Sequence, residues 1–588
     1  MNMKKSQRAL REFEKLKSQL AQTRNIVRHS KNSNLWNHEK SVRKKIKALS
    51  QLEHKHIRGY NRLYADWVRL LDEISVRLLA FYNKKNRTDY DFEEVVKKDH
   101  EGYLSSGIIA VLMSSHIPDL VAEQFKRYFP KNPKDEYPHA RAMQRTIHMH
   151  LGETNTGKTY NAIQRLKQAH SGVYLAPLRI LALEIFERLN EDGVPCSLIT
   201  GEEEIIVDGA QHVSSTVEKL NITKEYEVAV IDEIQMIGNS QRGQAWTRAL
   251  LGLLCPEIHV CGAFNAKTLL LKIIEDCGDQ YEIKEYFRQT PLEIYDKPFE
   301  FHDTEKGDAL VVFSKQRVLE ISKNYMDRGI KTSIIYGDLP PEVRKKQYAM
   351  FLNGETSVLV TTDAIGMGVN LPIRRIIFMS MQKFDGEEVR FLTSQEIKQI
   401  GGRAGRQGIY EIGYVGTNSL DQPYICESLE QPDSPLKTAV IGPSEEILNI
   451  RNLPLSQKLA LWSTRHKTLG YYRKMDIRDF LLILESVKQY NLPEEDQYKL
   501  MRLPFDVSKP ELLDCLMDFI EDYFVAQSTE LSKPTCFAQT LSELEIYYQK
   551  LNLYYSFSKN FNLEFDEQWV YRERVLLGEK INALLINL

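Results

Sequence analysis

Residues 152–159 read Gly-Glu-Thr-Asn-Thr-Gly-Lys-Thr and match the phosphate-binding P-loop pattern at all of its fixed positions. An alternating apolar run over residues 147–151 precedes the loop, and a helix-like stretch begins at Tyr160. A strand, a glycine-rich loop and a helix in this order are typical of a nucleotide-binding α/β unit. The sequence therefore predicts that the chain binds a nucleoside triphosphate.

The residue types of the loop indicate its chemistry. Its glycines let backbone N–H groups close around the phosphates, Lys158 can reach the β- and γ-phosphates, and the Thr159 hydroxyl can ligate Mg²⁺. The expected cofactor-binding residues are Gly152, Glu153, Thr154, Asn155, Thr156, Gly157, Lys158 and Thr159.

Two adjacent carboxylates follow the apolar run at residues 228–231. They stand where α/β sheets place their ligands, at the carboxyl end of a strand, and in P-loop NTPases an aspartate there helps to hold Mg²⁺. We expect Asp232 to hold Mg²⁺ together with Thr159, and Glu233 to orient and deprotonate the attacking water.

Short apolar runs alternate with helical patterns from about residue 137 to 435, which predicts parallel α/β sheets. Runs of strand length before a break at residues 289–291 are 173–175, 228–231 and 258–261, and those after it are 310–313, 333–336, 358–361 and 376–379. The second series contains no P-loop. Two such units predict a pair of similar domains that share one nucleotide.

Residues 399–406 of the second unit, Gln-Ile-Gly-Gly-Arg-Ala-Gly-Arg, place Arg403 and Arg406 three positions apart. Charge developing on a γ-phosphate needs a cation from outside the P-loop, which arginine fingers supply. A salt-bridged surface helix is the alternative, but the flanking glycines weaken a helix. We therefore expect both arginines to be catalytic and to act across the domain interface.

The predicted fold class is α/β, with two tandem RecA-like P-loop NTPase domains flanked by α-helical N- and C-terminal regions. The expected divisions are a basic helical arm at 1–60, a helical N-terminal domain at 61–136, the RecA-like domains at 137–290 and 291–435, and a helical C-terminal domain at 436–588. Residues 1–60 hold sixteen Lys or Arg against four acids, which fits a solvated face or an RNA-tracking arm. An aromatic stripe between Leu544 and Tyr555 favours core over a base-stacking platform.

Composition narrows the class of protein. Charged residues make up 27% of the chain, and the net charge is -2. Seven scattered cysteines without a C-x-x-C pair argue for a reducing compartment and against a zinc site. No apolar run reaches the length of a membrane span, and the basic N-terminus lacks the apolar stretch of a secretory signal. A bacterial cytoplasm is the expected compartment, with a mitochondrial matrix as the alternative.

The motifs between about residues 137 and 416 resemble those of superfamily 2 helicases, and among them the Suv3-type RNA helicases. The form Asp-Glu-Ile-Gln at 232–235 and the run Arg-Gly-Gln-Ala-Trp-Thr-Arg-Ala-Leu at 242–250 are the most specific matches. Further matching runs are 137–145, 176–179, 200–202, 215–218, 336–341 and 361–368. Departures are Glu153, where the family often has proline, and Ala263-Phe264, where an acidic residue is usual.

The resemblance implies ATP- and Mg²⁺-dependent translocation, 3′ to 5′, on single-stranded RNA with a 3′ overhang, and unwinding of the duplex ahead in RNA turnover. It adds Gln399 to the catalytic residues and Gly368 to the nucleotide contacts. The implied RNA contacts are Pro177, Arg179, Thr200, Gly201, Thr216, Tyr336, Gly337, Thr361 and Thr362. The residues implied to couple nucleotide state to RNA grip are Gln235, Asp363 and Gly366.

Two alternatives remain open at this point. Motifs that follow the backbone do not by themselves read the 2′-hydroxyl, so a DNA or RNA/DNA-hybrid helicase is one of them. A non-catalytic RNA-binding scaffold is the other, and the complete set of catalytic residue types argues against it. A 3′ exoribonuclease is a partner by analogy with the family only.

The segment between residues 375 and 392 predicts a β-hairpin, because two β-prone runs, 376–381 and 389–392, flank the turn-forming pair Asp385-Gly386. Related helicases carry a hairpin here that enters the duplex fork. We expect Lys383, Phe384 and Arg390 near its tip or flanks. The alternative is a surface hairpin that only extends the sheet.

Overall fold

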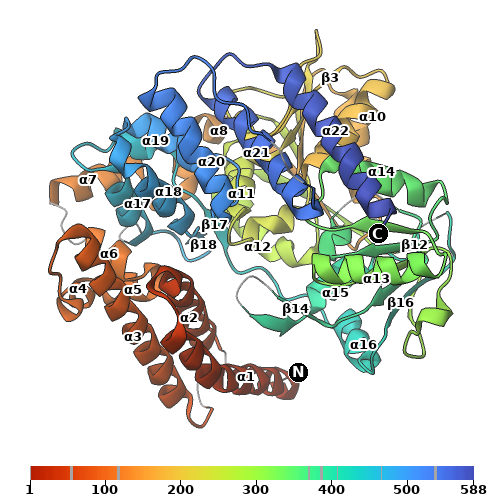
Figure 1. Ribbon diagram of the computed structural model, residues 1–588, viewed down its shortest axis with the longest axis horizontal. Helices are drawn as coiled ribbons and strands as arrows, with labels where there is room; N and C mark the ends of the chain where they lie inside the picture. The colour runs from red at the N-terminus through yellow and green to blue at the C-terminus, as the bar shows by residue number, and fades with distance from the viewer. Residues whose placement is uncertain are drawn as a thin grey trace. The chain divides into compact units, whose positions relative to one another are not determined.

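The computed structural model of the chain describes residues 2–52, 57–114, 119–367, 371–384, 388–406, 408–464, 467–535 and 539–588. The chain packs as two compact units. Unit 1 holds Met1–Lys131, Pro443–Thr468 and Asp476–Leu481, and unit 2 holds Asn132–Gly442, Leu469–Met475 and Leu482–Leu588. Figure 1 labels the helices and strands of both units.

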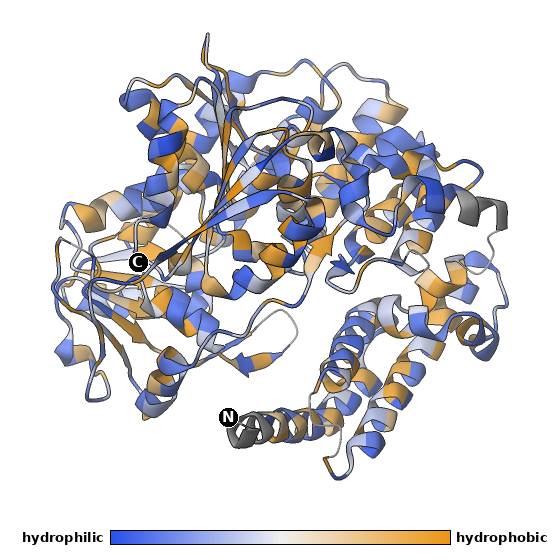
Figure 2. Ribbon diagram, turned by 180° about the vertical axis from the view of Figure 1, so that it is seen from behind, coloured by the Kyte–Doolittle hydropathy of each residue, from blue (hydrophilic) through white to orange (hydrophobic). Residues whose placement is uncertain are grey.

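Unit 1 is helical. Its helices include α1 (Asn2–His29), α2 (Leu35–Ser50), α3 (Tyr60–Asn86), α4 (Phe92–Lys98), α5 (His100–Ser106), α6 (Ile108–Ser114), α7 (Asp119–Tyr128) and α17 (Leu455–Thr464). Hydrophobic and hydrophilic residues alternate along the first three helices (Figure 2). Trp67, Leu70 and Ile74 of α3 are buried in the core, because their spacing places them on one face of the helix.

Two expected domain borders differ from this packing. The border after residue 60 falls at the start of α3, although the apolar faces of α2 and α3 share one core that also contains Phe13 of α1. Arg43 and Lys45 of the expected basic arm are buried, and the Arg43 guanidinium donates to the Ser105 carbonyl at 2.5 Å. Helix α17, expected in the C-terminal domain, packs on α5 and α6. The packing units differ from the expected domains because each amphipathic helix buries its apolar face against a neighbouring helix.

The first RecA-like domain of unit 2 is built on an eight-stranded sheet of order β4-β3-β5-β2-β6-β7-β1-β8. Every pairing in it is parallel except that of β3 with the short β4. The strands are β1 (Thr146–Gly152), β2 (Gly172–Ala176), β3 (Cys196–Ile199), β4 (Glu204–Ile205), β5 (His212–Thr216), β6 (Val228–Ile231), β7 (Glu257–Gly262) and β8 (Gln280–Tyr286). The helices are α8 (Pro138–Ala142), α9 (Lys158–Gln168), α10 (Arg179–Glu191), α11 (Gly243–Gly252) and α12 (Lys267–Cys277).

The second RecA-like domain has a six-stranded parallel sheet of order β11-β12-β10-β13-β16-β9. Its strands are β9 (Leu292–Ile294), β10 (Asp308–Val311), β11 (Thr332–Ile335), β12 (Val358–Thr361), β13 (Arg375–Phe378) and β16 (Gly413–Thr417). Its helices are α13 (Lys315–Asp327), α14 (Pro341–Leu352), α15 (Ser394–Gly401) and α16 (Gln422–Glu430). The prediction of two tandem α/β domains is therefore confirmed.

The rest of unit 2 is mainly helical. It contains β17 (Ala439–Ile441), β18 (Tyr472–Lys474), α19 (Glu494–Met501), α20 (Pro510–Ile520), α21 (Leu541–Asn560) and α22 (Glu567–Ile586), while α18 (Arg478–Val487) joins the two units in sequence. Helix α21 packs Leu544, Tyr547 and Tyr548 into the core of the second RecA-like domain. The aromatic stripe is therefore core, as expected. Among the described helices, none is both long and apolar enough to cross a membrane.

Candidate active site

One cavity of about 1000 Å³ in unit 2 receives side chains from both RecA-like domains. The first domain contributes the P-loop and the residues that follow β6, and the second contributes residues after β12 and from α15 onward. The sequence-predicted residues in its lining are the whole loop 152–159 together with Asp232, Glu233, Gln235, Gly366, Gln399, Arg403 and Arg406. These motifs lie far apart in the sequence, and the fold brings them together.

The P-loop joins β1 to α9. Gly157 has φ +76° and Asn155 has φ 62°, so the loop uses the left-handed region at a position where glycine is favoured. A Cβ at Gly152 would lie 2.2 Å from the Tyr286 carbonyl of the neighbouring β8, which requires glycine there. The Lys158 amine donates to the carbonyls of Gly152 and Glu153 at 3.2 and 2.7 Å. These contacts keep the amine at the mouth of the loop.

Asp232 is buried at the end of β6. Its carboxylate accepts hydrogen bonds from the Thr159 hydroxyl at 3.1 Å and from the Tyr174 hydroxyl at 2.9 Å. Burial, followed by the charge of Glu233, raises the pKa of Asp232 above its usual range. Such a carboxylate gains from a nearby cation, because the cation offsets the cost of its burial.

Glu233 adopts left-handed backbone geometry with φ 49°, and its backbone N–H donates to Asp232 at 3.0 Å. The Gln235 amide donates to the Glu233 carboxylate, and the Ala263 N–H donates to the Gln235 side-chain oxygen at 3.1 Å. Gln235 thus connects the second carboxylate to the end of β7. An uncommon backbone conformation at such a residue is typical of functional sites.

The second domain reaches the P-loop directly. The Asn155 amide donates to the carbonyls of Gly402 and Arg403 at 3.2 and 3.4 Å. The Arg403 guanidinium is held by the Gly366 carbonyl, with its Nη2 at 2.6 Å, and burial lowers its pKa. Arg406 lines the same cavity. The arginines therefore stand across the cavity from the phosphate loop.

Arg288, in the segment between the two domains, was not predicted from the sequence. Its guanidinium donates to the Gly402 carbonyl at 2.6 Å, and its backbone N–H donates to Glu153 at 2.7 Å. Glu153, the departure from the family pattern, thus binds this connecting segment. Arg288 belongs to no recognisable sequence motif. Its contacts with both domains could therefore be found only from the folded structure.

The implied RNA contacts follow the carboxyl ends of parallel strands. Thr200, Gly201 and Thr216 lie at the ends of β3 and β5, and Tyr336 and Thr362 follow β11 and β12. The carboxyl ends of a parallel sheet form a single edge. Pro177 and Gly337 come one and two residues after the ends of β2 and β11, and Thr361 ends β12.

Several of these side chains are buried or paired within the protein. Those of Thr200, Tyr336, Thr361 and Thr362 are buried, and the Tyr336 hydroxyl donates to Glu545 of α21 at 2.5 Å. In this conformation these side chains face protein atoms more than solvent. Arg179 forms ion pairs of 2.8–3.1 Å with carboxylates of both domains, namely Glu202, Glu203 and Glu342. The Arg179 guanidinium is therefore already paired with protein carboxylates in this conformation.

The expected hairpin forms from β14 (Gln382–Phe384) and β15 (Val389–Phe391), which pair antiparallel (Figure 1). Its first strand starts later than expected, because residues 375–378 form the central strand β13. Lys383 pairs with Asp363 at 3.0 Å and Glu396 at 2.7 Å, and Arg390 pairs with Glu396 at 2.8 Å. The hairpin's two cations thus anchor it to its own domain.

The exposed face of the hairpin is apolar. Phe384 is 60% exposed and Val389 62% exposed. The turn pair Asp385-Gly386 and the implied nucleotide contact Gly368 lie outside the described residues.

Comparison with known proteins gives three family matches. Residues 133–286 match the DEXQ-box helicase domain of Suv3, residues 292–408 match a helicase conserved C-terminal domain, and residues 541–587 match the ATP-dependent RNA helicase SUV3 C-terminal domain.

Relatives from three organisms extend the similarity. "ATP-dependent RNA helicase SUV3, mitochondrial" of Oryza sativa subsp. japonica is 37% identical over 478 residues, which cover 77% of this chain and 81% of that protein. "ATP-dependent RNA helicase SUPV3L1, mitochondrial" of Homo sapiens is 41% identical over 410 residues, or 66% of this chain and 52% of that protein. For "ATP-dependent RNA helicase SUV3, mitochondrial" of Saccharomyces cerevisiae the identity is 42% over 332 residues, or 54% of this chain and 45% of that protein.

This chain spans about half the length of the human and yeast relatives. All three names place those proteins in mitochondria. They agree with the mitochondrial alternative and give no support to the expected bacterial cytoplasm.

Proposed function

Because the chain belongs to the Suv3 family of helicases, we propose that it is an ATP-dependent RNA helicase, moving 3′ to 5′ along single-stranded RNA and unwinding duplexes ahead of it. The observation that carries this proposal is the shared cavity, in which the P-loop and the strand-end acids of one domain face the arginines of the other. A nucleotide held by both domains ties their relative motion to hydrolysis, which is what a translocating motor requires.

The spacing of Asp232 and the P-loop residue Thr159 fits a magnesium ion. Thr159 Oγ and Asp232 Oδ1 lie 3.1 Å apart, and adjacent ligands of an octahedral Mg²⁺ with bonds of about 2.1 Å lie about 3.0 Å apart. Mg²⁺, when bound, neutralises charge on the phosphate oxygens. These two residues would hold the ion, and Lys158 would bind the β- and γ-phosphates once it leaves the loop carbonyls.

The remaining residues perform hydrolysis in this proposal. Glu233, beside Asp232, takes a proton from the water that attacks the γ-phosphate. Arg403 and Arg406 stabilise the charge that develops on the transferred group, with Gln399 beside them. Arg403 leaves the Gly366 carbonyl to do so, and the same exchange couples nucleotide binding to the segment that contains Asp363.

Cations beside the strand ends support an RNA path over them. A Cβ at Gly201 would lie 3.8 Å from the Lys219 side chain, and the Arg344 guanidinium donates to the Gly337 carbonyl. Partial desolvation by the surrounding protein lowers the pKa of both cations. Lysine and arginine side chains that neutralise phosphates supply much of the affinity of a protein for a nucleic acid. Neither residue was predicted from the sequence.

Replacing Arg344 by alanine is expected to weaken binding of single-stranded RNA and to lower the slope of log affinity against log salt by about 0.7, the value for one phosphate contact on a single strand. The measurement is RNA binding by fluorescence anisotropy between low and moderate salt. Arg317→Ala is the control, since Arg317 is an exposed cation of the same domain that pairs with Glu320. An unchanged salt slope in Arg344→Ala would exclude the contact.

The apolar face of the hairpin supports a role in strand separation. Aromatic rings stack on bases of any sequence, with about 1–3 kcal/mol per base. We expect the double variant Phe384→Ser and Val389→Ser to retain RNA-stimulated ATPase activity while unwinding per ATP falls about tenfold, the loss that corresponds to 1.4 kcal/mol of stacking. The two side chains are exposed, so their removal leaves the core intact.

Leu420→Ser serves as the control for the hairpin variant, because Leu420 is 85% exposed elsewhere on the same domain. The measurements are strand displacement of a 3′-overhang RNA duplex and ATP turnover on the same samples. Wild-type unwinding per ATP in the double variant would mean that the hairpin is architectural.

ATPase assays with single-stranded RNA, single-stranded DNA and no nucleic acid separate the proposal from the alternatives. We expect RNA to stimulate turnover most strongly. Equal stimulation by DNA would favour the DNA or hybrid helicase, and no turnover with any of the three would favour the scaffold. A role in RNA turnover beside a 3′ exoribonuclease rests on family analogy, and co-purification with such a nuclease tests it.

A further inference from the structure

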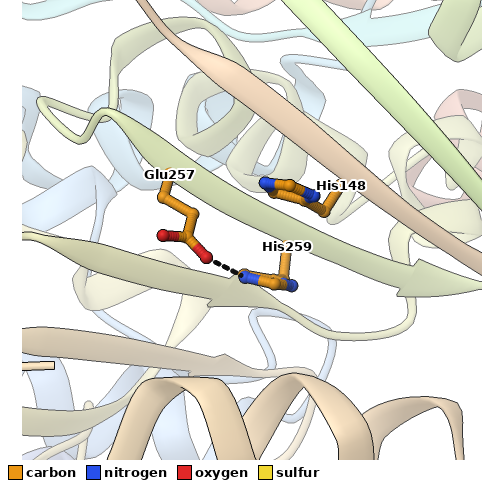
Figure 3. A group of neighbouring side chains, drawn as sticks. All are labelled: His148, Glu257 and His259. Carbon is orange, nitrogen blue, oxygen red and sulfur yellow. Dashed lines mark hydrogen bonds and ion pairs between the residues drawn. The ribbon is translucent and has the colours of Figure 1, made fainter. Parts of the chain in front are cut away.

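A row of histidine and carboxylate side chains crosses the first sheet beside its edge strand β8, and none of its residues lines the cavity of the candidate active site. In the parallel register of β7, β1 and β8, His148 pairs with His259 on one side and with Glu282 on the other. Glu257 lies two residues before His259 on the same face of β7, because side chains alternate along a strand. Figure 3 shows the side chains of His148, Glu257 and His259 beside one another.

The ligand atoms of these three residues all lie within 4.8 Å of one another. His259 Nε2 and Glu257 Oε1 are 2.9 Å apart, and His148 Nδ1 is 3.1 Å from Glu282 Oε2. The imidazoles of His148 and His259 stack with their centroids at 4.8 Å. Two imidazoles and a carboxylate therefore converge on a space of a few ångströms.

A second layer of contacts orients these ligands. Arg165 of α9 donates to both carboxylate oxygens of Glu257, at 2.9 and 2.7 Å. His259 Nδ1 lies 2.8 Å from His150 Nε2, and His150 Nδ1 lies 2.7 Å from the Tyr286 hydroxyl. Metal-binding histidines almost always have such a partner on the second ring nitrogen, because it fixes the tautomer.

We propose that His148, Glu257 and His259, without any cysteine, bind a divalent transition-metal ion of the zinc class. Two histidines and one carboxylate with an open fourth position are a known zinc ligand set. Bonds of about 2.0–2.1 Å require tetrahedral ligands about 3.4 Å apart, so the His148 ring turns to point its Nε2 at the ion. It has room to do so, since its side chain is 25% exposed.

The hydrogen-bonded chain from His259 through His150 to Tyr286 can adjust when His259 binds the ion. When His259 Nε2 binds the ion, its proton resides on Nδ1, which then donates to His150 Nε2. His150 in turn donates from Nδ1 to the Tyr286 oxygen. Each hydrogen bond of the chain is kept with its direction reversed, and no proton is gained or lost overall. The ion would join neighbouring strands beside the exposed edge strand β8.

Zinc and cobalt binding to the full chain tests the proposal. After dialysis against a chelator, the wild-type protein is expected to bind Co²⁺ with the visible bands of a tetrahedral site and without the near-ultraviolet band of a thiolate ligand. In His148→Gln the affinity for Zn²⁺ is expected to fall more than about 100-fold, because loss of an outer partner alone costs about 10–100-fold. Arg165→Gln, which leaves all three ligands in place, should show that smaller loss.

His302→Gln is the matched control, because His302 also lies beside two carboxylates, those of Glu300 and Asp303, and its side chain is 73% exposed. Thermal unfolding of each variant without metal checks that the fold is kept, and Zn²⁺ should raise the melting temperature of the wild type but not of His148→Gln. Equal zinc binding by the wild type and His148→Gln, or no tetrahedral cobalt spectrum in the wild type, would overturn the proposal and leave the row as a hydrogen-bonded polar patch.

Discussion

Replacing Glu233 by glutamine is expected to lower RNA-stimulated ATP turnover by at least about 100-fold, since a positioned general base contributes about 10²–10⁴-fold. The substitution keeps the shape of the side chain and can keep the contact with Gln235. ATP should therefore still bind. Lys158→Ala should abolish hydrolysis for another reason, because it removes the cation that binds the phosphates, and its nucleotide affinity should fall as well.

The measurements are steady-state ATP turnover with saturating RNA and equilibrium binding of a fluorescent ATP analogue. Glu191→Gln is the control, because Glu191 is exposed at the end of α10. Turnover of Glu233→Gln within tenfold of the wild type would remove Glu233 from the role of base. Loss of ATP binding in the same variant would instead indicate a structural role for its carboxylate.

Replacing Arg406 by alanine is expected to slow hydrolysis about 10³-fold or more, the effect of losing an arginine finger, while nucleotide affinity changes much less. The reason is that the finger acts on charge that develops only in the transition state. Arg406 lines the cavity from the second domain, and Arg403 beside it is held by the Gly366 carbonyl. We expect Arg403→Ala to act in the same direction.

Single-turnover hydrolysis with RNA present, compared with nucleotide binding, tests the arginine finger. Arg328→Ala provides the control, since Arg328 is an exposed arginine that ends α13 in the same domain. Hydrolysis by Arg406→Ala at the wild-type rate would mean that the cavity between the two domains is not the site of catalysis.

Most of the residues that line the candidate nucleotide site could be named in advance, because their motifs are local. The P-loop, the acids after β6 and the arginines after α15 each depend on a few consecutive residues, whose conformations follow from glycine and from strand and helix ends. The strands expected at 228–231 and 358–361 were found with those bounds. Short continuous apolar runs are typical of strands that are buried on both faces of a parallel sheet.

Contacts between distant segments could not be predicted in the same way. Arg288, Lys219 and Arg344 acquire their positions only when separate elements pack together. The burial of Tyr336 against α21 and the pairing of Arg179 with carboxylates of both domains depend on a partner more than 150 residues away in sequence. Residue type and spacing contain no information about such partners.

The amino-acid sequence by itself determined the class of the fold, the order of the two α/β domains and the chemical groups available to a nucleotide, because these depend on periodicity and on motifs within short segments. Only the tertiary structure decided which groups face one another. It anchored the cations of the hairpin on Glu396 and left Phe384 exposed. It also aligned His148 with His259, 111 residues apart, since strand order in a sheet is set by the packing of the whole domain.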